Sequence, residues 1–251
     1  MSRVFSLAKK CYFTWMQAII LAAGLGTRMG ALTKNTPKPM LKILNKNLLE
    51  LKINNLPDEI TEVILVVGYK SDVIKKYFKE SFNNKKIIYV EDSTLTGTAH
   101  ALWQTKNLLK NKFIVMMGDD IYNKTSIAEC AKNPLSICCK IVQEKDRGDR
   151  VILKKNNLSG FTTQTKNLYL KKPSTLAFTG MYCLTKEIFR YKPVKLQTRD
   201  EWGLPQTLLK VASKKKIKII KTNHWVQISS PEDLKDAEKI LKKWPKNELL
   251  I

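Results

Sequence analysis

Short apolar runs alternate along the chain with segments in which apolar residues recur every three or four positions. Six runs have the length and the β-branched content of buried strands, at residues 18–22, 63–67, 87–90, 113–117, 136–142 and 217–220. Because strands and helices alternate, the pattern predicts an α/β fold in which helices cover both faces of a mostly parallel mixed sheet. Ligands of such sheets bind beyond the carboxyl ends of the strands.

Three segments are predicted to be helices. The first begins at Ser71 and turns four apolar residues to one face, Val73, Ile74, Tyr77 and Phe78. The second spans residues 98–110 and turns four residues inward, Ala101, Leu102, Leu108 and Leu109. The third follows Ser230, which can cap a helix that has Pro231 in its first turn.

The length of 251 residues fits one domain with a sizeable core. We expect residues 16–251 to form that domain, and residues 1–15 to be a dispensable extension before it. No apolar run reaches the roughly 18 residues of a membrane span, so no membrane partner is expected. The five cysteines include no C-x-x-C pair, which indicates reduced thiols in a cytoplasmic protein.

The net charge of +23 allows two interpretations. A basic chain could bind nucleic acid, and a steep salt dependence of that binding would reveal it. However, arginine accounts for only six of the 45 basic residues, whereas base reading and bidentate phosphate contacts favour arginine. We therefore favour a lysine-rich solvated surface and expect no nucleic-acid partner.

Residues 17–40 read QAIILAAGLGTRMGALTKNTPKPM and carry the strongest functional signal. A strand followed by Gly24 and Gly26 lets backbone N–H groups approach a phosphate chain closely. Arg28 and Lys38 add two cations, and the prolines on either side of Lys38 hold it in a rigid segment. The loop matches neither the dinucleotide fingerprint, since Met29 stands where its third glycine would be, nor a Walker A motif.

Five further motifs follow the loop: VVGY at 66–69, LTGTA at 95–99, MGDD at 117–120, TGMY at 179–182 and WVQISSPEDL at 225–234. With the loop, they resemble the sugar-phosphate nucleotidyltransferases, also called nucleoside-diphosphate-sugar pyrophosphorylases. The resemblance implies a Rossmann-like three-layer sandwich. It also implies an enzyme that joins an NTP to a sugar-1-phosphate, with glucose or mannose as the default sugar, and that releases pyrophosphate.

The resemblance gives catalytic roles to three residues. Arg28 would clamp the β- and γ-phosphates, and Lys38 would reach the α-phosphate and the attacking phosphate. Asp119 follows an apolar run and would bind Mg²⁺ together with phosphate oxygens. Its neighbour Asp120 is expected to face solvent.

The resemblance also implies a set of nucleotide contacts: Leu21, Ala22, Ala23, Gly24, Gly26, Thr27, Asp92, Gly97 and Thr98. Asp92 stands where related chains commonly have a glutamine that reads the base. A carboxylate only accepts hydrogen bonds, so it suits guanine or cytosine better than uracil or thymine.

The acceptor half departs from the family. Gln227 replaces the aspartate that serves as a second metal ligand in many members, and the sugar-binding E-K-P motif has no clean counterpart. Its candidates are Gln164 with Lys166, or residues 171–173. The acceptor contacts that we expect are Lys166, Thr179, Gly180 and Glu201.

These departures leave alternatives open. The chain could be an active enzyme with an unusual acceptor, a weak or inactive relative that only binds nucleotide, or a cytidylyltransferase-like enzyme with a non-sugar phosphate acceptor. The presence of Gly24, Arg28, Lys38 and Asp119 together favours activity. Whether the protein is a monomer or a homo-oligomer stays open.

Overall fold

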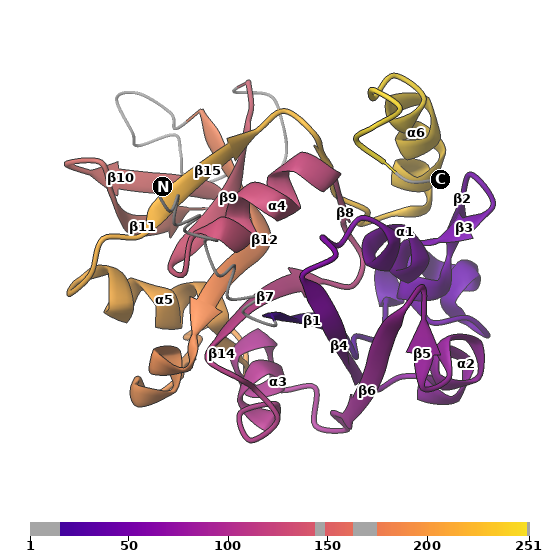
Figure 1. The fold of residues 1–251 in the computed structure, drawn as a ribbon, viewed down its shortest axis with the longest axis horizontal. Coiled ribbons are helices and arrows are strands. Elements are labelled where there is room, and N and C mark those ends of the chain that lie inside the picture. The colour runs from indigo at the N-terminus through magenta and orange to yellow at the C-terminus, as the bar shows by residue number, and fades with distance from the viewer. Residues whose placement is uncertain (1–15, 144–148, 163–174, 250–251) are drawn as a thin grey trace, which may run out of the picture.

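The computed structural model of the chain describes residues 16–143, 149–162 and 175–249. Within these ranges, ten strands form one mixed sheet (Figure 1). Its path runs through β11 (Asn157–Thr162), β10 (Arg150–Lys154), β12 (Leu176–Thr185), β7 (Lys112–Met117), β1 (Met16–Ala22), β4 (Ile60–Val67), β6 (Lys85–Glu91) and β5 (Ser81–Phe82). Strand β9 (Ser136–Ile141) also pairs with β12, and β15 (Lys218–Thr222) pairs with β9.

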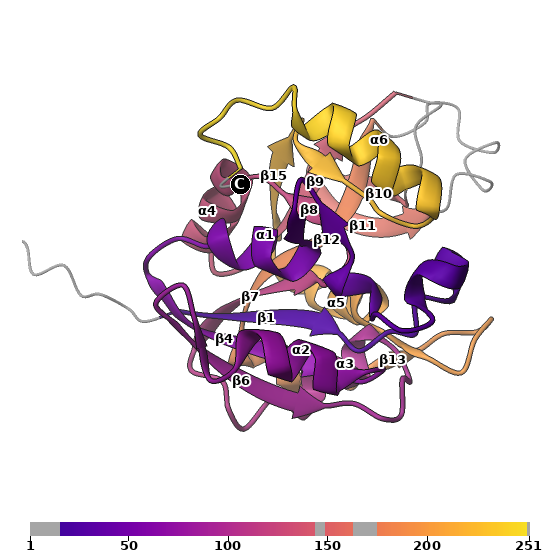
Figure 2. The same ribbon diagram turned by 90° about the vertical axis from the view of Figure 1, so that its right-hand side faces the viewer.

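The centre of the sheet is parallel. β1 lies between β4 and β7 and runs parallel to both, and β4 runs parallel to β6. In Figure 2 the arrowheads of β1 and β6 point the same way, towards the indigo loop that follows β1. β12 enters antiparallel between β7 and β9. The carboxyl ends of β1 and β7 therefore meet at one edge, which is where the glycine loop begins.

Alternate residues of β1 face two separate apolar clusters, as the period of a strand requires. Ala18 and Ile20 pack in one cluster, while Ile19 packs in the other. The first cluster receives side chains from α1 (Leu48–Asn54), α2 (Ser71–Phe78) and α4 (Lys124–Lys132), and the second from α3 (Thr98–Gln104) and α5 (Leu204–Ala212). Helices thus cover both faces, which confirms the predicted α/β sandwich with a mixed sheet.

A third apolar cluster supports the segment that follows the glycine loop. Met29 packs there with Ala237 and Leu241 of α6 (Pro231–Leu241), the helix that lies beside β2 (Lys42–Ile43) and β3 (Lys46–Asn47) in Figure 1. The Ser230 hydroxyl accepts a hydrogen bond from the Asp233 amide, and the Asp233 carboxylate accepts one from the Ser230 amide. This capping box confirms the predicted start of the helix.

The remaining elements are short. They are the 3₁₀ segments η1 (Thr27–Thr33), η2 (Lys38–Met40) and η4 (Lys186–Arg190), and the strand pairs β8 (Ile121–Tyr122) with β16 (Trp225–Val226) and β13 (Val194–Lys195) with β14 (Trp202–Gly203). No described helix has the length and apolar character that crossing a membrane requires. Residues 1–15 lie outside the described ranges, so the predicted extension stays a prediction.

All six predicted strands are confirmed, with boundaries shifted by a few residues. The predicted helix 98–110 is wrong at its end, because α3 stops at Gln104. There the Thr105 hydroxyl donates to the Leu102 carbonyl at 2.7 Å and the chain turns away. Leu109 is buried as expected, but Leu108 is 44% exposed. In α2 the expected face holds for Ile74 and Phe78 but not for Tyr77, which is 45% exposed.

Four of the five cysteines are described, and all four are free and buried: Cys130, Cys138, Cys139 and Cys183. Burial raises the pKa of the Cys138 and Cys183 thiols to about 12, so little nucleophilic thiolate forms at neutral pH. In a Cys11→Ser variant we therefore expect almost no reaction with a colorimetric thiol reagent at pH 8 until denaturant is added. A fast-reacting thiol in the native variant would contradict this burial.

Candidate active site

The glycine loop is shaped to receive Lys38. Gly26 has φ +65°, in the left-handed region that glycine adopts without strain, and its carbonyl accepts a hydrogen bond from the Met29 amide at 2.9 Å. A Cβ at Gly26 would lie 2.9 Å from Cβ of Lys38. The absence of a side chain at Gly26 therefore lets the Lys38 segment pack directly across the loop.

Asp119 reaches the same place from the neighbouring strand. The amide of Gly118, which follows β7, donates to the Leu21 carbonyl of β1 at 2.8 Å. A Cβ at Gly118 would lie 2.7 Å from that carbonyl oxygen, so only glycine allows the two chains to approach so closely. This turn brings Asp119 to the carboxyl end of the sheet beside the glycine loop.

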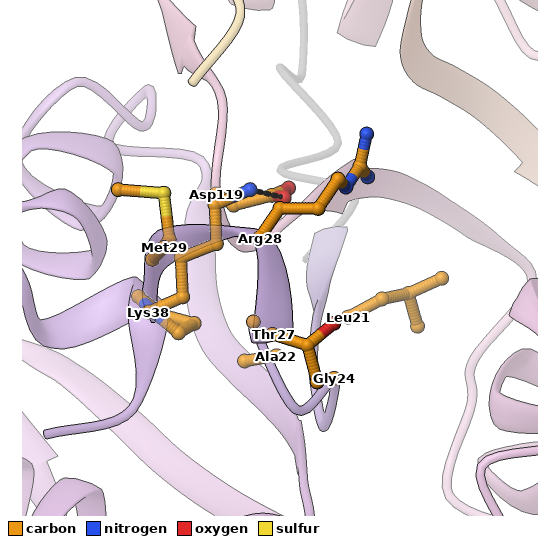
Figure 3. Close-up of a pocket in the computed structure, with 10 residues that line it drawn as sticks. Leu21, Ala22, Gly24, Thr27, Arg28, Met29, Lys38 and Asp119 are labelled. Atoms are coloured by element: carbon orange, nitrogen blue, oxygen red, sulfur yellow. Dashed lines mark hydrogen bonds and ion pairs between the residues drawn. The ribbon is translucent and has the colours of Figure 1, made fainter. Parts of the chain in front are cut away.

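Lys38 and Asp119 form an ion pair with 2.5 Å between Nζ and Oδ2 (Figure 3). Pro37 is extended at φ −64° and ψ 144°, and it holds Lys38 at the start of η2. The Lys38 side chain is 8% exposed and that of Asp119 is 37% exposed, so the pair lies in the wall of an open site. Two residues that are 81 positions apart in the chain are thus joined at the site.

The pair lines a pocket of about 210 Å³, which we call the loop pocket. Its wall consists of Leu21, Ala22, Gly24, Gly26, Thr27, Arg28, Met29, Lys38, Pro39 and Asp119. The structure therefore brings together all three predicted catalytic residues and five of the predicted nucleotide contacts. Ala23 is buried instead, and its carbonyl accepts a hydrogen bond from the Tyr69 amide at 3.2 Å.

A second pocket of about 430 Å³, which we call the sheet pocket, adjoins the first. Its wall consists of Arg28, Thr98, Met117, Asp120, Asp149, Phe178, Thr179, Gly180, Tyr182, Pro205, Trp225, Gln227 and Ser229. Arg28 lines both pockets, and the consecutive residues Asp119 and Asp120 line one each. Two ligands, one in each pocket, would meet at these three residues.

Two of the predicted acceptor contacts lie at an irregularity of β12. Its register against β9 shifts between Phe178 and Tyr182, and Gly180 has φ +74°. A Cβ at Gly180 would lie 2.6 Å from Cγ of Met117. The Thr179 hydroxyl donates to the Cys138 carbonyl at 2.9 Å, so it is already engaged within the sheet. What these residues offer a ligand is the wall of the sheet pocket.

The loop before α3 has a different arrangement from the one we expected. Asp92 is 2% exposed, and its Oδ1 accepts hydrogen bonds from the amides of Thr94 at 3.1 Å and Leu95 at 3.2 Å. The carboxylate thus holds its own loop and lines neither pocket. A Cβ at Gly97 would lie 2.6 Å from the Trp202 carbonyl oxygen, so this glycine packs against β14. The roles of Asp92 and Gly97 in nucleotide binding stay predictions.

The other predicted acceptor contacts are not placed in either pocket. Glu201 stands beside Gly97 with its carboxylate 3.8 Å from the Arg199 guanidinium, and it lines neither pocket. Lys166 lies outside the described residues, as do Gln164 and residues 171–173. The part of the acceptor site that would replace the E-K-P motif therefore stays a prediction.

The expectation that Asp120 faces solvent is wrong. Asp120 is 5% exposed, and its Oδ2 accepts a hydrogen bond from Nε1 of Trp225 at 3.2 Å. Burial, and then the charge of Asp119, raise the pKa of this carboxyl well above its usual range. The side chain turns inward to Trp225, and the ammonium of Lys52 contacts the backbone carbonyl of the same residue.

Lys52 is a residue of the site that the motifs of the sequence did not reveal. It lies in α1, is 1% exposed, and donates a hydrogen bond from Nζ to the backbone carbonyl of Asp120. Burial lowers the pKa of the Lys52 ammonium to about 8, although the charges of Asp120 and Asp119 oppose that shift. The sequence indicates its buried position only through its spacing from Leu48, since a lysine four residues after a buried leucine lies on the inner face of a helix.

The residues of the site fit a magnesium ion that arrives with a phosphate ligand. Mg²⁺ commonly takes one or two carboxylates and completes its shell with phosphate oxygens and water. Asp119 supplies one exposed carboxylate, and Gln227 supplies an amide oxygen in the adjoining pocket. Among the described residues, no group of three or more acidic, histidine or cysteine side chains could hold an ion without such a ligand.

Comparison with known proteins identifies the family. A family model described as "Nucleotidyl transferase" matches residues 17–243. The bifunctional protein GlmU of Methanocaldococcus jannaschii is 32% identical over 229 residues, which cover 90% of this chain and 54% of that protein. The chain thus spans about half the length of the GlmU proteins that it matches.

Two other relatives match over nearly their whole length. A UTP–glucose-1-phosphate uridylyltransferase, AglF of Haloferax volcanii, is 30% identical to this chain. The match covers 96% of that protein and 90% of this chain. A D-glycero-α-D-manno-heptose 1-phosphate guanylyltransferase of Campylobacter jejuni is 33% identical. The match covers 96% of that protein and 87% of this chain. A UDP-glucose pyrophosphorylase structure with UDP-glucose shares the fold, with a TM-score of 0.74 at 21% identity over 91% of this chain and 98% of that one.

A Gly26→Ala substitution should weaken NTP binding at the loop pocket. The new Cβ would press on Lys38, and alanine at a positive φ adds about 1 kcal/mol of strain. Thermal shift and equilibrium binding with each NTP would measure the effect. Gly30→Ala is the control for strain alone: Gly30 has φ +56° and ψ −127°, a conformation at least as costly for alanine, but its Cβ would meet nothing within 4 Å. Equal losses of affinity in both variants would show that strain alone is responsible.

Proposed function

Because the chain belongs to the nucleotidyl transferase family, we propose that it joins an NTP to a sugar-1-phosphate and releases pyrophosphate. The names of the two relatives that it matches over 96% of their length support this class of reaction, since both are sugar-1-phosphate nucleotidyltransferases. The reaction would form a nucleotide-sugar.

The observation that carries the proposal is the Lys38–Asp119 ion pair at the junction of two pockets. The loop pocket has the glycines and cations that suit a triphosphate. The sheet pocket is larger and has hydroxyl, amide and carboxylate groups in its wall, which suit an acceptor rich in hydroxyls. An NTP in the first and a sugar-1-phosphate in the second would bring their phosphates together beside Arg28 and Lys38.

The chemistry needs no covalent enzyme intermediate. An oxygen of the sugar phosphate would attack the α-phosphorus in line, the bond to the β-phosphate oxygen would break, and pyrophosphate would leave with the electron pair. The protein must hold two anions together and offset the charge that moves to the leaving group. In this proposal Lys38 would contact the α-phosphate and the attacking phosphate, and Arg28 would contact the leaving group.

Asp119 and Gln227 would hold Mg²⁺ together with phosphate oxygens. When bound, such an ion neutralises negative charge on the phosphates. Asp119 then serves a second purpose, because its carboxylate also orients the Lys38 ammonium. The Gln227 oxygen carries no charge, so this second ligand would contribute less affinity than an aspartate.

The relatives differ in the base that their names specify, uracil in one and guanine in the other. The preference for GTP or CTP that Asp92 suggests therefore stays a prediction, and so do the identity of the sugar and the oligomeric state. Buried free thiols fit a reducing compartment, so a cytoplasmic location remains part of the proposal.

The test is pyrophosphate release across a grid of four NTPs and a panel of sugar-1-phosphates with Mg²⁺. We expect release from one pair, a fall of about 100-fold or more in kcat for Lys38→Ala and Asp119→Ala, and no turnover after chelation of the metal. Lys215→Ala, which removes an exposed ion pair with Glu187 on the outer surface, is the control and should keep full activity.

Each result of the grid separates the alternatives. No pyrophosphate release with any sugar-1-phosphate, together with release from another phosphate acceptor, would favour the cytidylyltransferase-like alternative. NTP binding without any turnover would favour a binding-only relative. Preference for UTP or dTTP over GTP and CTP would contradict the prediction from Asp92.

A further inference from the structure

Lys52 places a positive charge next to the turn that follows β7 and carries Asp119. It lies in α1, whose other buried residues are mostly leucine and isoleucine, and α1 packs beside β8 (Figure 1). An ammonium in such surroundings costs folding free energy unless it is matched by acceptors. A leucine at this position would have avoided the cost, so the contacts of Lys52 call for an explanation.

Those contacts all lie on the short segment that follows β7. Nζ of Lys52 donates to the backbone carbonyl of Asp120, and it lies 5.6 Å from the centre of the Tyr122 ring. An ammonium over an aromatic face is attracted by the ring electrons. The lysine thus contacts the residues on either side of Ile121, immediately after Asp119.

The same segment connects the two pockets. The Tyr122 hydroxyl accepts a hydrogen bond from the Met117 amide at 3.3 Å and donates to the Thr179 carbonyl at 2.9 Å. The Asp120 carboxylate accepts a hydrogen bond from Trp225. Met117 precedes the Gly118–Asp119 turn, whereas Thr179 and Trp225 line the sheet pocket. A shift of the segment that follows β7 would therefore move Asp119 and the wall of the sheet pocket together.

We propose that Lys52 is a positioning residue, whose ammonium holds the Asp120 carbonyl and thereby fixes Asp119 against Lys38 at the junction of the two pockets. The proposal rests on the function proposed above and names a further residue that the reaction requires. A displacement of about 1 Å at a reacting group can lower the rate about 100-fold. We therefore expect the contact between Lys52 and the Asp120 carbonyl to affect the rate more than the substrate affinity.

Lys52→Met tests the proposal because methionine has a similar length and no charge. Lys85→Met is the matched control: Lys85 is also a buried lysine, and it donates to the carbonyls of Pro57 at 3.1 Å and Ile60 at 2.7 Å, at the opposite end of the strands from the site. Steady-state kinetics would give kcat and KM, and hydrogen exchange would report on the Gly118 amide, which is bonded to Leu21.

For Lys52→Met we expect kcat to fall by about tenfold to 100-fold with KM for the NTP within threefold, and the Gly118 amide to exchange faster. Lys85→Met should change neither, although both variants lose a buried hydrogen-bonded lysine. A kcat within twofold of the native value, or unchanged exchange at Gly118, would overturn the proposal. If the native protein turns over no substrate pair, the proposed function fails, and the exchange measurement alone decides the role of Lys52.

A double variant guards against misfolding of Lys52→Met, which takes a nearby positive charge away from the buried Asp120 side chain. Lys52→Met with Asp120→Asn removes both ionisable groups, and replacing buried charges of opposite sign together by neutral groups is often tolerated. The side-chain amide oxygen introduced by the second substitution can still accept from Trp225. We expect low kcat and fast Gly118 exchange to persist in this variant. Full recovery of both would show that Lys52 only neutralises Asp120, which would overturn the proposal.

Discussion

Charge balance at the end of β7 governs the site, because two consecutive carboxylates leave that strand in opposite directions. Asp119 faces the open loop pocket and pairs with Lys38. The Asp120 side chain turns into the protein and accepts a hydrogen bond from Trp225, while its backbone carbonyl accepts one from Lys52. Like charges at such close range repel strongly when water is scarce. The two lysines, which come from separate segments, offset the negative charge of the double-aspartate turn.

Close backbone packing at the strand ends is the second constraint. Gly118 lies against the Leu21 carbonyl. A Cβ at Gly68 would lie 2.8 Å from the carbonyl oxygen of Ala23. Gly97 lies against the backbone of β14. Each of these glycines stands in a motif that suggests a ligand, yet protein atoms already fill the space where a side chain would be. Their first role is to bring segments together, and the pockets form as a result.

The sequence predicted the parallel half of the fold well, because buried parallel strands read as continuous apolar runs such as residues 18–22 and 63–67. It predicted the loop pocket for a related reason, since that pocket is built from one local segment plus Asp119. It did not predict the strands β10, β11 and β12 that form the antiparallel half. Nor did it place Asp120 and Lys52. The spacing of Lys52 from Leu48 indicates an inner helix face, but the group that a buried charge contacts lies on another element and cannot be read from that spacing. The acceptor contacts depend on such non-local pairings throughout.

The third apolar cluster joins the beginning of the described chain to its end. Met29, just after the glycine loop, packs with α6 and with Leu249, and the carboxylate of Glu248 accepts hydrogen bonds from Asn123 and Thr125 at the start of α4. On the ribosome, the loop is made long before α6, whose residues cover its back. The loop must therefore wait for α6 to emerge before its support is complete. A nascent chain that holds a finished parallel sheet would still lack a finished site.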